Sequence, residues 1–109
     1  MGITSVLIIY TTISNAEQAE LIAQTLLAEQ LVACVNIWPI NSMYTWNSKI
    51  EKTSEIAMLL KTKETCQESV YQRLKELHPY ECPAIITLDV KQTNPDFANW
   101  VETQTNYKC

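Results

Sequence analysis

A short segment of this chain, residues 77–83, gathers the side chains that are best able to do chemistry. It holds His78, the only histidine, together with the phenol of Tyr80, the carboxylate of Glu81 and the thiol of Cys82. An imidazole among such groups could bind a metal ion or handle a proton. Two of the four prolines, at positions 79 and 83, equally fit a rigid connection between a helix and a strand. On this segment alone we favour the connection.

His78 is the best candidate for a metal ligand. A neutral imidazole suits Cu(II), Zn(II) or Ni(II), and Cys82 or Glu81 could supply a further donor. One histidine per chain makes a weak site unless a symmetric oligomer brings several copies together. In the alternative, His78 binds the last carbonyl groups of the helix that precedes it, and we favour this interpretation over a physiological metal site.

The composition indicates a single domain, residues 1–109, with a net charge of −4. No apolar run approaches the ~20 residues that a membrane helix requires, and the first residues lack the basic start of a signal peptide. The 8 lysines and arginines are scattered, so they form no basic stripe for a phosphate backbone. The single glycine, at position 2, excludes the glycine-rich loops that bind nucleotide phosphates. We therefore expect a cytoplasmic protein that binds neither nucleic acid nor membrane.

The four cysteines, at positions 34, 66, 82 and 109, show no CxxC spacing, and one histidine is too few for a conventional zinc finger. Disulfide bonds are not expected in a reducing cytosol. We expect Cys34 to act as a small buried apolar residue. The terminal Cys109 is expected to be exposed and free.

Hydrophobic patterns predict an alternation of strands and helices. The run at residues 6–10 is rich in β-branched residues, which is typical of a central strand. The complete series is a strand at 6–10, a helix after a capping box at 14–17, strands at 33–46 and 50–60, a helix from a capping box at 65–68 to Pro79, a strand at 84–90, and a helix that begins at Asn94-Pro95. This order predicts an α+β fold of the ferredoxin-like βαββαβ type with a C-terminal helix. Phe97 and Trp100 are expected in its core.

The second and third predicted strands form an unusually long hairpin. They flank the turn Asn47-Ser48, and Pro39 implies a bend or a sheet edge. Arms of this length extend past the core of a small domain, so four apolar side chains need a partner surface: Tyr44, Trp46, Ile50 and Met58. A closed homo-oligomer that uses these hairpins would cover them.

The chain resembles the CutA family, the divalent-cation tolerance proteins. The resemblance spans nearly the whole sequence and rests on these residues, in this order: 33–37 (Ala-Cys-Val-Asn-Ile), 44–46 (Tyr-Thr-Trp), Glu55, Lys61-Thr62, 78–81 (His-Pro-Tyr-Glu), Pro83 and Trp100. It implies a ferredoxin-like protomer, a homotrimer whose hairpins wrap neighbouring subunits, and a relation to the PII signalling proteins. It also implies a link to copper and other divalent metals.

Two features depart from the family pattern. The hairpin turn, where the family usually has glycine, is Asn47-Ser48, and asparagine tolerates the left-handed conformation. The metal site proposed for bacterial members uses a cysteine late in the first strand and a pair of histidines. This chain has Tyr10, Leu77 and His78 at those positions, so one ligand of that set is retained.

These observations support two hypotheses. In the first, the chain is a cytoplasmic homotrimer that binds divalent metal, Cu(II) foremost, and contributes to divalent-cation tolerance. In the second, it is a PII-like regulatory trimer whose intersubunit clefts bind a small anion or an unidentified partner protein. Such a cleft would be lined by Lys61, Tyr80, Glu81 and Trp46, although Lys61 could instead form a salt bridge across the trimer. We expect no enzyme, because one histidine leaves little choice of catalytic base.

Overall fold

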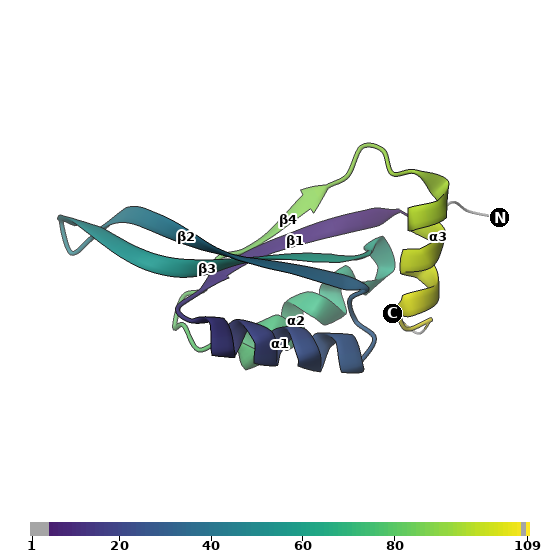
Figure 1. Ribbon diagram of the computed structural model, residues 1–109, viewed down its shortest axis with the longest axis horizontal. Helices are drawn as coiled ribbons and strands as arrows, with labels where there is room; N and C mark the ends of the chain where they lie inside the picture. Colours follow the sequence, from purple (N-terminus) through teal and green to yellow (C-terminus); the bar gives the residue numbers. More distant parts are fainter. Residues whose placement is uncertain (1–4, 108) are drawn as a thin grey trace.

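The computed structural model describes residues 5–107 and 109, and its elements follow the predicted order (Figure 1). The strands are β1 (Val6–Ile13), β2 (Cys34–Trp46), β3 (Lys49–Lys63) and β4 (Ile85–Asp89). The helices are α1 (Ala16–Ala28), α2 (Gln67–Leu77), which a short 3₁₀ turn (Glu64–Cys66) precedes, and α3 (Pro95–Gln104).

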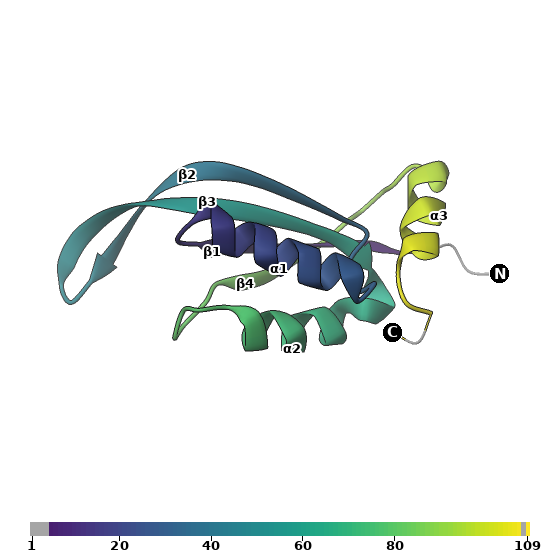
Figure 2. The same cartoon turned by 60° about the horizontal axis from the view of Figure 1, so that its bottom comes forward.

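The strands form one antiparallel sheet in the order β2-β3-β1-β4. The apolar strand β1 is central, as predicted, since Tyr10 pairs with Leu59 of β3 on one side and with Ile86 of β4 on the other. Helices α1 and α2 lie side by side on one face of the sheet, and α3 lies at one end of it (Figures 1 and 2). This arrangement confirms the ferredoxin-like α+β fold with a C-terminal helix.

The main core fills the space between the sheet and the helices α1 and α2. Its fully buried members include Ile9 and Ile13 of β1, Leu26 of α1 and Leu74 of α2. A second, smaller cluster joins α3 to the end of the sheet through Val6, Ala33, Ala98 and Val101, with Phe97 packed against it. Among the described residues, no helix combines the length and apolar character needed to cross a membrane.

The prediction that Trp100 lies in the core was wrong. Its side chain is 42% exposed, and its ring lies beside that of Phe97, with 5.7 Å between the ring centroids. Helix α3 packs through one narrow face, which Ala98 and Val101 occupy. Trp100 precedes Val101 by one residue, a turn of about 100° around the helix, so it falls outside that face.

The helix starts differ in part from the predicted capping boxes. At α1 the cap is Asn15, whose side chain accepts a hydrogen bond of 2.9 Å from the backbone of Gln18, whereas the Ser14 hydroxyl donates to the Gln18 side chain. At α2 the predicted box was wrong, because residues 64–66 form a 3₁₀ turn and the side chain of Cys66, at the cap, makes no hydrogen bond to the helix. A short 3₁₀ turn is common at the start of a helix and replaces the side-chain cap here.

The long hairpin is confirmed. All 13 residues of β2 pair with β3, and the two-residue turn places Asn47 and Ser48 at φ values of 51° and 64°, the conformation of a type I′ turn. Strand β1 pairs only with the residues of β3 from Ile56 onward, so residues 40–46 and 49–55 extend beyond the sheet (Figure 1). The extension gives the protein a longest dimension of 52 Å. Pro39 lies on the edge strand, as predicted.

A disulfide joins Cys66 and Cys109, so the prediction of free cysteines was wrong for this pair. Cys66 is fully buried at the start of α2, and Cys109 is partly exposed. The prediction rested on the redox state of a compartment, but the fold brings two cysteines 43 positions apart in the sequence to a Cα separation of 4.5 Å. Cys34, half-buried, and Cys82, exposed, are free.

Candidate functional site

His78 stands at the junction between α2 and the segment that leads to β4. Proline at position 79 ends the helix here, and the backbone N–H of His78 donates to the carbonyl of Leu74 at 2.8 Å. The side chain is directed inward and is 7% exposed. It therefore belongs to the protein interior at the end of α2.

Both nitrogens of the His78 ring have partners within the protein. The backbone N–H of Tyr80 donates to Nδ1 at 3.1 Å, so Nδ1 is the acceptor and carries no hydrogen. Nε2 then carries the hydrogen and donates it to the carbonyl of Thr12 at 2.8 Å. A metal ion at either nitrogen would displace one of these bonds. The ring fastens the segment after α2 to the end of β1.

The neighbouring donor groups lie on the surface. Glu81 and Cys82 are both exposed, and the Cys82 thiol is free. Within residues 5–107 and 109, no three side chains of His, Cys, Asp or Glu gather closely enough to hold a metal ion. One protomer therefore supplies scattered donors and no assembled metal centre in the part of the chain that the structure describes.

Tyr80 faces the base of the hairpin. Its hydroxyl donates a hydrogen bond of 2.7 Å to the carboxylate of Glu55 on β3, and its ring lies edge-on to His78 at 4.7 Å between centroids. Burial, followed by the hydrogen bond to the Glu55 carboxylate, raises the pKa of the Tyr80 phenol well above its ordinary value. Tyr80 therefore remains a neutral hydrogen-bond donor over the physiological pH range.

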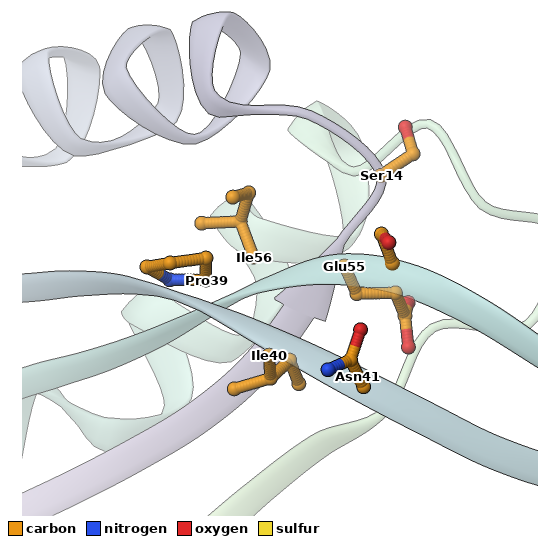
Figure 3. A pocket seen from close by; sticks show the side chains of 7 residues that line it. Ser14, Pro39, Ile40, Asn41, Glu55 and Ile56 are labelled. Carbon is orange, nitrogen blue, oxygen red and sulfur yellow. The ribbon is translucent and has the colours of Figure 1, made fainter.

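A hollow of about 310 Å³ lies where the hairpin leaves the sheet (Figure 3). The view shows Asn41 and Glu55 on neighbouring strands, with Ser14 supplied by the segment that follows β1. The complete lining consists of Ser14, Pro39, Ile40, Asn41, Ser54, Glu55 and Ile56. Of these residues, the sequence analysis had noted Pro39 as a bend or sheet edge, Ser14 as part of a capping box and Glu55 through the family resemblance. Nothing in the sequence indicates that polar residues on an exposed ribbon line the same hollow.

The predicted cleft residues are spread over the protomer. Trp46 stands beside the hairpin turn, whereas Lys61 pairs with Cys34 at the other end of the same hairpin, roughly 40 Å away along the strands. The ammonium group of Lys61 lies 5.7 Å from the centroid of the Phe97 ring. Tyr80 lies at the base of the hairpin, beside Glu55, and Glu81 follows it on the surface. These four residues could line a common cleft only if they come from different copies of the chain.

Three of the four residues predicted to need a partner surface are exposed on the extension of the hairpin. Tyr44 is 44% exposed, Trp46 61% and Ile50 76%. The prediction was wrong for Met58, which is fully buried in the main core. Met58 pairs with Thr11 of β1, so it lies in the part of β3 that belongs to the sheet. Within β3, Met58 is buried where the strand pairs with β1, and Ile50 is exposed where it does not.

The fold and the hairpin define a class of protein, a ferredoxin-like α+β chain with an extended β2–β3 ribbon. The chain belongs to the family of the CutA1 divalent ion tolerance protein, whose sequence profile matches residues 7–104.

Individual relatives agree with this assignment. The chain is 43% identical to the divalent-cation tolerance protein CutA of Pyrococcus horikoshii over 99 residues, which cover 91% of this chain and 97% of that protein. It is 39% identical to the protein of the same name from Thermotoga maritima, over 87% of this chain and 94% of the relative. The crystal structure of the divalent ion tolerance protein CutA1 from Ehrlichia chaffeensis is similar with a TM-score of 0.93 at 35% identity, and the match covers 96% of this chain and 99% of that one.

Proposed function

We propose that this chain acts as a homotrimer in divalent-cation tolerance and binds divalent metal ions, Cu(II) foremost. The family match over residues 7–104 is the observation that carries the proposal, since relatives of near-equal length bear the name divalent-cation tolerance protein. The proposal assigns binding and no catalysis.

The hairpin supports the homotrimer. Residues 40–46 and 49–55 form a two-stranded ribbon without a third strand beside it, and such a ribbon is marginally stable in water by itself. Tyr44, Trp46 and Ile50 present apolar surface on this ribbon. A closed ring of identical subunits would cover the ribbon of each one with its neighbour.

The hydrogen bonds of His78 favour other donors for the metal. Binding at His78 would break its bond to Thr12 or Tyr80, whereas the Glu81 carboxylate and the Cys82 thiol are exposed. Thiolate and carboxylate groups both bind Zn(II), and thiolate also binds copper. Because a single protomer assembles no three donors among its described residues, the proposed site takes Glu81 and Cys82 from more than one copy. His78 then holds the segment that carries them.

The proposed compartment is the cytoplasm. A glutathione-rich compartment keeps most thiols reduced. The redox state of Cys66 and Cys109 in cells therefore bears on this proposal. Alkylation of cysteines in intact cells, followed by mass spectrometry, measures the redox state of this pair directly.

Two measurements test the proposed function. Light scattering should give a mass about three times the 12.5 kDa of the chain, and a monomer at micromolar concentration would contradict the trimer. Calorimetric titration of Cu(II) and Zn(II) into chelator-washed protein should show submicromolar binding with a whole number of ions per trimer. Weak, non-saturating binding would contradict the metal assignment.

Three variants identify the donors. Glu81→Gln and Cys82→Ser should each weaken Cu(II) binding at least about tenfold, because each removes one ligand. The matched variant His78→Asn should lower the melting temperature and weaken Cu(II) binding less than either donor variant does, because it removes no ligand. If Cu(II) binding is lost in His78→Asn but retained in Glu81→Gln and Cys82→Ser, the choice of donors is refuted and the imidazole of His78 is the ligand.

A further inference from the structure

The last residues of the chain are fastened to the core by a covalent bond. The disulfide joins Cys109 to Cys66, which is fully buried among the residues of the main core. Cys109 packs against the same core but is partly exposed. Of the two residues in this bond, Cys109 is therefore the more accessible to solvent.

Backbone hydrogen bonds also hold this tail. The backbone N–H of Asn106 donates to the carbonyl of Gln30 just after α1, at 2.7 Å, and the N–H of Cys109 donates to the carbonyl of Asn106 at 3.1 Å. The tail leaves α3 and runs toward the start of α2 (Figure 2). It covers the place where the end of α1 and the start of α2 meet. Terminal segments open locally more readily than the core does, so the loss of a covalent tie there favours opening of the tail.

We propose that the pair Cys66 and Cys109 is a thiol–disulfide exchange site, through which low-molecular-weight thiols control the attachment of the C-terminal tail. The proposal does not depend on metal binding. Its chemistry uses only the two cysteines and a thiol reductant such as glutathione.

The exchange proceeds in two balanced steps. A reductant thiolate attacks Sγ of Cys109, forms a mixed disulfide with it and breaks the bond to Cys66, whose departing thiolate takes a proton from water. A second reductant thiolate attacks the reductant sulfur of the mixed disulfide and releases the thiolate of Cys109. Two electrons pass from two reductant thiols to the protein, and the reductant leaves as its own disulfide.

The geometry determines which sulfur reacts. Cys66 is fully buried, so an attacking thiolate reaches the bond from the side of Cys109. After reduction Cys66 remains a buried thiol, while the tail keeps its non-covalent contacts and loses its covalent tie. The open form uncovers one end of the core. In the views of Figures 1 and 2 this end lies away from the hairpin turn of the same protomer.

Thiol counting tests whether the bond exists. Protein purified without reductant and then denatured should show two reactive thiols, those of Cys34 and Cys82, and four after reduction. Four reactive thiols before reduction, in protein handled under air, would overturn the proposal. Brief treatment with glutathione, followed by mass spectrometry, should find the mixed disulfide on Cys109, and a mixed disulfide on Cys66 would contradict the direction of attack.

Digestion with carboxypeptidase tests the control of the tail. Reduction of the folded protein should accelerate release of the C-terminal residues by at least about tenfold, because the tail then opens locally. Cys109→Ser should be digested rapidly with or without reductant. The matched variant Cys34→Ser, which removes the other free thiol, should respond to reduction like the native chain. Equal digestion of the oxidised and reduced native protein would overturn the proposal.

Discussion

Met58 and Met43 lie on opposite strands of the same hairpin, but Met58 is fully buried and Met43 is 68% exposed. We expect Met58→Ala to lower the free energy of unfolding by about 3 kcal/mol. Transfer of the truncated side chain accounts for about 2 kcal/mol and the cavity left in the core for about 1 kcal/mol. The ratio of folded to unfolded protein then falls about a hundredfold.

Urea denaturation followed by circular dichroism measures this loss at a fixed protomer concentration, since the stability of an oligomer depends on concentration. Met43→Ala is the matched control, with an expected change within about 0.5 kcal/mol for the protomer itself. If Met43→Ala lowers the free energy of unfolding by more than this, the loss should grow on dilution, because it would come from weaker association of the chains. The burial argument is refuted if Met58→Ala costs less than about 1 kcal/mol.

Two further predictions concern polar groups that are buried or partly buried. Thr11 and Thr62 are both fully buried, but among the described residues the Thr11 hydroxyl has no hydrogen-bond partner, whereas that of Thr62 donates to the carbonyl of Leu31 at 2.7 Å. Thr11→Val should therefore raise the free energy of unfolding by about 1 kcal/mol, and Thr62→Val should lower it by a similar amount. Urea denaturation measures both changes, and equal effects of the two substitutions would contradict this prediction. Because the pKa of Tyr80 is raised in the folded state, stability should fall as the pH rises past about 10, where the unfolded chain loses this proton and the folded chain keeps it. Glu55→Gln should lower the pKa of Tyr80 in an absorbance titration, and an unchanged titration would show that the carboxylate has no part in the shift.

Much of the fold could be predicted because the patterns that specify it are local. The apolar run at residues 6–10 identified the central strand, and Asn47-Ser48 identified the hairpin turn, because each depends on neighbouring residues only. The capping box at residues 65–68 failed, since a 3₁₀ turn competes with it and nothing in the local sequence separates the two.

The candidate site was predictable in part. The sequence drew attention to His78 because it is the only imidazole, and proline at the next position located it at the end of a helix. Its two ring hydrogen bonds, to Thr12 and Tyr80, join segments that are far apart in the chain. Spacing in the sequence does not predict such partners. From the sequence, the imidazole of His78 could equally have been free to bind a metal ion.

The order of the elements, the α+β class and the family could all be read from the chain, because periodicity, turn chemistry and motif residues are local features of the sequence. The packed fold was needed to show that Met58 lies in the core while Ile50 of the same strand is exposed, since that depends on where β1 ceases to pair with β3. It also decided that Cys66 meets Cys109. Contacts of this kind arise when the whole chain packs against itself, and neither residue carries a local signal of the other.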